Sequence, residues 1–226
     1  MCMAETAPAL SKASPANAPA PRRNLRVEQK EATRRRIRQA ARELFDHQGY
    51  TAVQVDQIAK AAGVSRAAFY LHFKDKEAIL VDIALDYTPR ILALMRRLKG
   101  PAPTQEAIRA WMADWVSLMT MERAVPAIFN EVVRREGHRP PYVQTLVDRI
   151  IAALGESLPA FDAAVRPGAR HDQARAWADI LNIEATRTAC AAVGRGDDRY
   201  CIAALDAVAE MFGYFLADDR FAAAKI

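Results

Sequence analysis

Hydrophobic positions recur at helical spacing along most of the chain. From about Glu28 to His47 they stand at i, i+3, i+4, i+7 and i+8, which places them on one face of an α-helix. These positions are Ile37, Ala40, Ala41, Leu44 and Phe45. No segment shows the convincing alternation of apolar and polar residues that a half-buried strand requires. The pattern therefore predicts an all-α protein with about nine helices.

Glycine and proline residues divide the pattern into helices and domains. We expect a disordered tail over residues 1–24, a first domain over 25–75, a linking helix over 76–100 and a C-terminal domain over 101–226. Lys99–Pro103 is the strong break on which the last boundary rests. The expected helices are Glu28–His47, Gln54–Ala62, Ala67–Phe73, Lys76 to about Leu98 with a possible kink at Pro89, Thr104–Met121, Glu122–Glu136, Pro141–Leu158, Arg170–Val193 and Asp198–Ala217.

The stretch from Gln54 to Phe73 has the pattern of two short helices joined by a tight turn. Gly63 accepts the left-handed backbone that ends a helix, and it leaves room for a second helix to approach. Ser65 is a good N-cap for that helix, because its hydroxyl can accept a backbone N–H. Phe69 and Phe73, four residues apart, can anchor it to the core. Such a pair is typical of a helix-turn-helix, whose second helix enters the major groove of DNA.

The side chains left on or near the open side of the second helix suit a nucleic acid. Arg66 can reach guanine O6 and N7 or a phosphate, and Tyr70 and His72 can donate to phosphate oxygens. Ala67 and Ala68 are small enough to let the helix approach DNA closely. The alternative is an ordinary helical hairpin with a surface tyrosine and histidine.

The run from Ile37 to Leu80 resembles the N-terminal domain of TetR-family transcriptional regulators. The matching residues are Ile37-x2-Ala40-Ala41-x2-Leu44-Phe45-x3-Gly49-Tyr50, then Val55-x2-Ile58-Ala59-x2-Ala62-Gly63-Val64-Ser65, then Phe69-Tyr70-x-His72-Phe73-x2-Lys76-Glu77-x2-Leu80. They follow the family's order and spacing over roughly a fifth to a quarter of the chain. Gln54 and Ala68 depart from the family, which usually has Ser or Thr at the first position and often Thr at the second. We expect these departures to weaken one helix cap by about 1 kcal/mol and to remove one phosphate donor.

The resemblance and the residue types together predict a set of DNA-contacting residues. Lys76 matches the family near the start of the next helix, where it is well placed for a phosphate. Four arginines crowd the first half of the first helix and are expected to meet phosphates at least in part: Arg34, Arg35, Arg36 and Arg38. The predicted DNA-binding residues are Arg36, Gln54, Ser65, Arg66, Ala67, Ala68, Tyr70, His72 and Lys76.

Basic residues are concentrated in the part of the chain that holds the helix-turn-helix. The net charge is +5, but residues 22–76 carry +7 and the remainder carries −2. A basic lobe beside a near-neutral one is typical of a DNA-binding domain joined to a separate second domain. Arg22, Arg23 and Arg26 can form a mobile basic arm that adds salt-sensitive affinity, or they are only a solvated terminus.

The composition argues against several other classes of protein. No apolar run approaches the roughly 20 residues of a membrane-spanning helix, and Met1–Leu10 lacks the features of a signal peptide. The three cysteines form neither a disulfide framework nor a metal-ligand spacing. The four histidines stand in no metal-binding or acid–base spacing, and no Ser, Cys or phosphate-loop motif is present. We therefore expect a cytoplasmic protein that is not an enzyme, needs no cofactor or metal and does not enter a membrane.

The last two long helices are candidates for pairing two chains. A helix-turn-helix usually binds two half-sites about 34–36 Å apart, which calls for a dimer. TetR-like proteins pair these two helices into a four-helix bundle, and the resemblance implies the same homodimer here. The alternative is that they only close the core of their own domain. Their lining residues are Trp177, Ile180, Leu181, Ala185, Thr188, Ala189, Ala192, Ile202, Leu205, Val208, Ala209, Phe212 and Phe215.

An aromatic stripe in the C-terminal domain is a candidate ligand site. Trp111 and Trp115 lie on one helix, and Phe129 and Tyr142 can face them, as the apolar cavity of a small hydrophobic effector requires. Asn182 interrupts an otherwise apolar helix, and a buried amide needs a partner, which a ligand can provide. These five residues are the predicted ligand-binding set; the alternative for the stripe is plain core.

These observations predict a sequence-specific, DNA-binding transcriptional regulator. The favoured form is a repressor that leaves a palindromic double-stranded operator when a small hydrophobic effector binds. The alternatives are an activator, a regulator without a small ligand, or a helical protein-interaction module. The last alternative leaves the basic lobe unexplained.

Overall fold

The described part of the chain is entirely helical, as predicted. The computed structural model describes residues 25–121, 140–193 and 198–221, which form nine helices and no strand. The helices are α1 (Leu25–Gln48), α2 (Val55–Ala61), α3 (Arg66–Tyr70), α4 (Lys76–Met95), α5 (Gln105–Met121), α7 (Pro141–Gly155), α8 (Pro159–Ala163), α9 (His171–Ala192) and α10 (Arg199–Leu216). The predicted tail over residues 1–24 and the predicted helix over 122–136 lie outside the described residues.

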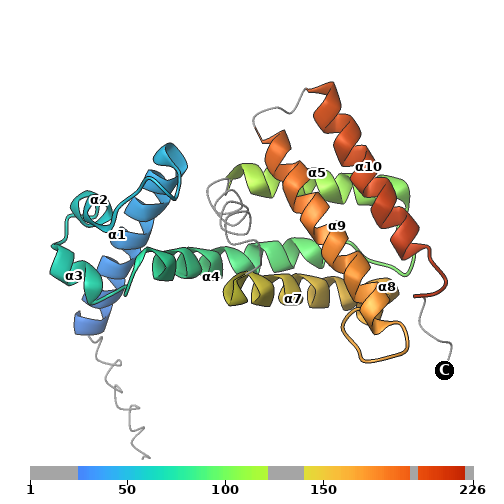
Figure 1. Ribbon diagram of the computed structural model, residues 1–226, viewed down its shortest axis with the longest axis horizontal. Helices are drawn as coiled ribbons and strands as arrows, with labels where there is room; N and C mark the ends of the chain where they lie inside the picture. The colour runs from blue at the N-terminus through green and yellow to red at the C-terminus, as the bar shows by residue number, and fades with distance from the viewer. Residues whose placement is uncertain (1–24, 122–139, 194–197, 222–226) are drawn as a thin grey trace, which may run out of the picture.

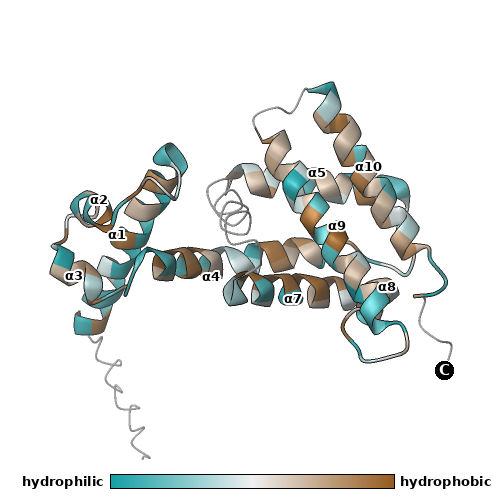
Figure 2. Cartoon of the chain, in the orientation of Figure 1, coloured by the Kyte–Doolittle hydropathy of each residue, from teal (hydrophilic) through white to brown (hydrophobic). Residues whose placement is uncertain are grey.

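The first three helices form a small lobe around the apolar face of α1. Ile37 and Ala41 on that face are fully buried, together with Ile58 of α2 and Phe69 of α3. The predicted i, i+3, i+4 stripe is therefore the face that packs. Many residues of α1, α2 and α3 are hydrophilic, whereas hydrophobic residues are more frequent along α4 and α7 (Figure 2).

Helix α4 connects this lobe to the larger C-terminal one (Figure 1). The side chain of Asp75 caps α4 by accepting a hydrogen bond from the N–H of Ala78 at 2.7 Å. α4 continues through Pro89, which is exposed, as far as Met95. One cluster of buried side chains extends from Ile37 in α1 through α4 to Phe212 in α10, so α4 contributes to a core that both lobes share.

In the C-terminal lobe α7 packs along α4, while α5, α9 and α10 pack against one another (Figure 1). Sequence reasoning missed α8, because the predicted helix Pro141–Leu158 stops before Pro159 and the next predicted helix begins at Arg170. Proline is tolerated at the first position of a helix, where its missing N–H costs no hydrogen bond, and Pro159 starts α8 in this way. Gly155 permits the close approach of α7 and α8, since a Cβ there would lie 3.1 Å from the backbone nitrogen of Asp162.

Candidate nucleic-acid interface and ligand site

The turn between α2 and α3 is shaped by Gly63. Its φ is +65°, in the left-handed region predicted for it. The N–H of Val64 donates to the carbonyl of Ala59 at 3.0 Å, and the N–H of Gly63 donates to that of Lys60 at 3.1 Å. These two bonds form a Schellman motif, which satisfies the last carbonyls of α2 and ends the helix.

Capping side chains set both limits of α3. The Ser65 hydroxyl oxygen accepts a hydrogen bond from the backbone N–H of Ala68 at 3.0 Å, which confirms the predicted N-cap. The helix ends at Tyr70 and not at Phe73 as predicted. Asp75 already stands in an extended conformation as the cap of α4, so the chain must leave helical geometry before it.

Two phenylalanines anchor α3 and orient its outer surface. Phe69 and Phe73 are 0% and 2% exposed, as expected of anchors. Tyr70 remains 45% exposed, and its ring lies edge-on to Phe69 with 5.3 Å between centroids. Ala67 is exposed and Ala68 is half-buried. The outward surface of α3 is therefore small, with Tyr70 as its largest predicted contact.

Arg66 is held over this surface by an ion pair. Its Nη1 donates to the two carboxylate oxygens of Asp56 at 2.9 and 2.8 Å, and its guanidinium lies 5.8 Å from the centroid of the Tyr70 ring. Both side chains of the ion pair are 63% exposed. Such a pair contributes at most about 1 kcal/mol, so a phosphate or a guanine can compete for Arg66.

Leu71 is an exposed residue that sequence reasoning missed. It is 79% exposed beside Tyr70, and an apolar side chain at this place can contact a thymine methyl group. Its position between the anchors Phe69 and Phe73 is the signal that would have found it, because neighbours of buried positions in a helical turn point outward.

Gln54 stands at the N-cap of α2, where we expected a weakened cap. Its backbone N–H donates to Oε1 of Gln57 at 2.6 Å, which is one half of a capping box. Gln57 thus compensates in part for the missing Ser or Thr. The side chain of Gln54 is exposed, and its contact with DNA stays a prediction.

Lys76 is engaged inside the lobe, which sequence reasoning did not foresee. Its ammonium donates to the carbonyls of Tyr50 and Val53 at 2.6 and 2.9 Å, and it lies 4.3 Å from the centroid of the Tyr50 ring. Lys76 therefore ties the connection between α1 and α2 to the start of α4. Its predicted phosphate contact is untested, and the structural role is the one that these distances support.

His72 is half-buried and lies beside cationic side chains. Among the described residues no hydrogen-bond partner reaches its Nδ1, which is buried. Burial, followed by the charges of Lys30 and Arg34, lowers the pKa of His72 below its usual value of 6.5. The imidazole is thus biased toward its neutral form, and a phosphate contact by His72 stays a prediction.

Helix α1 carries an arginine ladder that faces α4. We use "arginine ladder" for Arg34, Arg38 and Arg42, which stand four residues apart. Arg34 bonds Asp82 through Nη2 at 2.6 Å and Nε at 3.3 Å, and Arg38 reaches Asp82 at 3.4 Å. Arg38 and Arg42 each lie 3.6 Å from Asp86. The ladder thus pairs its residues with two carboxylates one helical turn apart on α4.

The ladder includes two of the four arginines of α1 from which phosphate contacts were expected at least in part. Arg34 and Arg38 are directed toward α4, and Arg34 also donates to the carbonyl of His72 at 3.0 Å. Arg35 and Arg36 are exposed, so they are the ones available to phosphates. The i, i+4 spacing of basic residues in α1 and of acidic residues in α4 is the signal that could have predicted the ladder.

Most of the predicted ligand-binding residues lie in the core. Trp111 and Trp115 are 3% and 1% exposed, and the ring of Trp111 lies 5.3 Å from that of Phe212. The Nε1 of Trp111 donates to the carbonyl of Leu94 at 3.0 Å. Among the described residues, Nε1 of Trp115 and Oδ1 of Asn182 have no hydrogen-bond partner. Phe129 lies outside the described residues.

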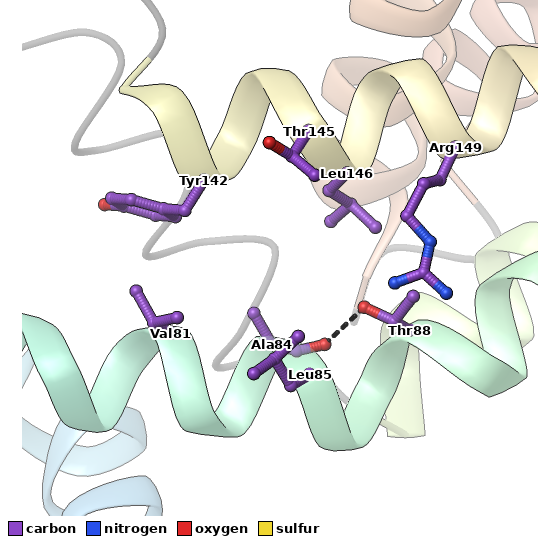
Figure 3. Close-up of a pocket in the computed structure, with 8 residues that line it drawn as sticks. All are labelled: Val81, Ala84, Leu85, Thr88, Tyr142, Thr145, Leu146 and Arg149. Carbon is purple, nitrogen blue, oxygen red and sulfur yellow. Dashed lines mark hydrogen bonds between the residues drawn. The ribbon is translucent and has the colours of Figure 1, made fainter.

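Tyr142, one of the predicted ligand residues, lines a slot between two described helices. This slot, of about 190 Å³, opens between α4 and α7 (Figure 3). Sequence reasoning did not foresee that α4 forms one of its walls. Apolar side chains on the outward face of α4, such as Val81 and Leu85, are the signal that could have indicated it.

The last two helices divide the predicted pairing residues between core and surface. Leu181, Ala185, Ala189 and others are buried within the lobe. Trp177, Ile180 and Ile202 are 36%, 47% and 49% exposed, and Tyr214 is 76% exposed. Core closure therefore explains part of the predicted set, while the surface of α9 and α10 retains large apolar side chains.

In residues 25–121, 140–193 and 198–221, no group of three or more His, Cys, Asp or Glu side chains could hold a metal ion. None of the helices in these ranges is long and apolar enough to cross a membrane.

The N-terminal part of the chain matches a known protein family. A family model described as bacterial regulatory proteins, tetR family, matches residues 37–83. An uncharacterized HTH-type transcriptional regulator, YerO of Bacillus subtilis, is 24% identical over 183 residues, which is 72% of this chain and 63% of YerO. The HTH-type transcriptional repressor Rv1474c of Mycobacterium tuberculosis is 38% identical over 66 residues, which is 29% of this chain and 35% of Rv1474c. The chain thus spans less than two thirds of either relative.

A solved structure extends the likeness to the C-terminal lobe. The transcriptional regulator FadR from Bacillus subtilis, in complex with stearoyl-CoA, has a TM-score of 0.52 and 18% identity. The match covers 81% of this chain and 97% of that one. At this identity the likeness concerns the fold alone.

Proposed function

The chain belongs to the TetR family of bacterial regulatory proteins, and on that premise we propose that it represses transcription as a homodimer bound to an operator. Proteins of this family are transcription regulators and not enzymes, in agreement with the prediction from the sequence. The protein would act in the cytoplasm, on double-stranded DNA with a palindromic site.

The outward surface of α3 is the observation that carries the proposal. It presents Arg66 and Tyr70 on a short helix whose start is capped by Ser65. The Ser65 hydroxyl accepts the capping bond and keeps its own O–H for a phosphate oxygen. The helix belongs to the segment of residues 22–76, whose net charge is +7, and phosphate attraction supplies much of the affinity of such a lobe for DNA.

Exposed apolar residues on α9 and α10 support the homodimer. Trp177, Ile180 and Ile202 are each at least 36% exposed, although contact between large apolar side chains and water is unfavourable. A second copy that covers these helices would bury them and would place two α3 helices on one duplex. Palindromic operators follow from such a two-fold arrangement.

Release by a small effector is the proposed means of control. One relative is described as a repressor, and the FadR structure holds stearoyl-CoA. The slot between α4 and α7 supports a ligand here, because one of its walls is the helix that joins the two lobes. An effector that prefers one position of α4 would shift the equilibrium between DNA-bound and free forms.

Genomic footprinting with the purified full chain tests the proposed function. We expect protected sites to be few and palindromic, and transcription from the adjoining promoter in vitro to fall when the protein is added. Increased transcription would favour an activator. Absence of any protected duplex site would favour a protein-interaction module and would contradict the proposal.

A further inference from the structure

The slot between α4 and α7 combines an apolar wall with one cationic side chain. Arg149 on α7 closes one end, and Tyr142 lies toward the other (Figure 3). The apolar lining side chains are Val81, Ala84, Leu85 and Leu146. A slot of this kind favours a molecule with an apolar body and a negative end.

Arg149 has no carboxylate partner among the described residues, whereas the nearby arginines Arg175 and Arg96 are each paired with one. The adjacent Asp148 is bonded by Arg175 at 2.5 Å. Glu156, further along the chain, is paired with Arg96 at 2.6 Å. Among the described residues these two carboxylates are thus engaged by other arginines, and the exposed guanidinium of Arg149 is left for a ligand.

The two threonines of the slot strengthen this argument. Oγ1 of Thr88 donates to the carbonyl of Ala84 at 2.7 Å, and Oγ1 of Thr145 donates to that of Pro141 at 2.8 Å. A hydroxyl has one hydrogen to donate, so both threonine donors are committed to the backbone. The guanidinium of Arg149 points toward Thr88 (Figure 3) and supplies the donors at that end of the slot.

We propose that this slot binds a small monocarboxylate with one aromatic ring or a short aliphatic chain. A guanidinium can donate two parallel hydrogen bonds to a carboxylate, which a neutral amide cannot match. The volume of about 190 Å³ sets the size, since an apolar cavity of roughly 150 Å³ holds one benzene. A ring with its carboxylate fits, whereas a long acyl chain exceeds the slot.

The slot and the arginine ladder share one stretch of α4. Val81 and Leu85 line the slot, and the residues that follow each of them, Asp82 and Asp86, pair with the ladder on α1. A ligand bound between α4 and α7 therefore contacts the same segment of α4 that forms ion pairs with α1. This consequence for DNA rests on the proposed function, whereas binding of the carboxylate does not.

Calorimetric titration of the full chain without DNA tests the proposal. The probes are benzoate, phenylacetate, hexanoate and octanoate, each beside its primary amide, up to about 10 mM. We expect saturable binding of at least one acid, about 10- to 100-fold weaker binding of its amide and a similar loss in Arg149→Met. Arg149→Lys should recover part of the affinity, and Arg166→Met, which changes a 78% exposed arginine outside the slot, should leave it within about 2-fold.

Three results would overturn the proposal: no saturable binding of any acid, equal binding of acid and amide, or unchanged affinity in Arg149→Met. Circular dichroism of each variant shows whether its fold is intact. Operator binding is measured separately. If the chain binds operator DNA but no carboxylate, only the ligand site is rejected. If it binds a carboxylate but no operator DNA, only the regulator function is rejected.

Discussion

Asp82 of α4 lies 2.6 Å from the guanidinium of Arg34 on α1, and its other carboxylate oxygen accepts from Arg38 at 3.4 Å. The Asp82 side chain is 14% exposed. One carboxylate thus joins the first helix of the DNA-binding lobe to the helix that enters the C-terminal lobe. A movement of α4 would be transmitted to α1 through this contact.

Asp82→Asn tests whether the contact holds the two helices together. It removes a charge bonded by two arginines, and we expect it to destabilise the protein by about 1.5–3 kcal/mol, measured by urea unfolding. It should also reduce the effect of an effector on operator affinity. Asp86→Asn is the matched control, because Asp86 is 38% exposed and lies 3.6 Å from its arginines. The control should cost less than about 1 kcal/mol. An equal loss of unfolding free energy in the two variants would contradict the larger contribution expected of Asp82.

Two nearby lysines should have different functions. Lys76→Met removes charged hydrogen bonds to the carbonyls of Tyr50 and Val53, so we expect a loss of about 1.5–3 kcal/mol in unfolding free energy. Lys74 is 80% exposed, and Lys74→Met should leave stability unchanged. If Lys74 meets a phosphate, its loss should reduce the slope of log affinity against log salt by about 1. A reduced slope with full stability in Lys76→Met would instead support the phosphate contact predicted from the sequence.

His72 should make the protein less stable in mild acid. The pKa of His72 is lowered in the folded chain, so the unfolded state binds the proton more readily. The contribution of the neutral imidazole is fully present above about pH 6.5 and is lost as the pH falls toward the folded pKa. We therefore expect the melting temperature to fall more steeply below about pH 6.5 in the wild type than in His72→Gln. Parallel pH profiles of the two proteins would show that His72 does not carry the effect.

The exposed surface of α9 can be tested by adding a charge. Ile180 is 47% exposed, and Ile180→Glu should shift sedimentation from dimer toward monomer and weaken operator binding. Leu25→Glu is the matched control, since Leu25 is a 68% exposed aliphatic residue of α1. It should leave the dimer intact. An unchanged dimer in Ile180→Glu would place the pairing surface elsewhere.

The local elements of the N-terminal lobe could be predicted because each depends on residues close in sequence. Gly63 and Ser65 fix a turn and a cap by their own backbone chemistry. The partners of Lys76 and Arg34 lie 23 to 48 residues away along the chain. Only the folded chain brings them together, so the hydrogen bonds that Lys76 and Arg34 make within the protein could not be predicted from the sequence.

The ligand site was harder to predict, because an apolar stripe does not distinguish core from cavity. Trp111 and Trp115 satisfy the same helical spacing whether they face a ligand or Phe212. The slot depends on the distance between α4 and α7, which no local pattern specifies. Arg149 was overlooked because its lack of a partner is a property of the folded structure.

Binding of fluorescent operator DNA by the full chain, measured by anisotropy over a range of salt, tests the central claim most directly. Wild type and Tyr70→Ala are compared, with circular dichroism and sedimentation as controls for fold and pairing. We expect log affinity to fall linearly with log salt and Tyr70→Ala to bind about 10-fold or more weakly at each salt concentration. Association that is insensitive to salt, or a Tyr70→Ala variant that binds as well as the wild type, would contradict the assignment of α3 as the helix that reads DNA.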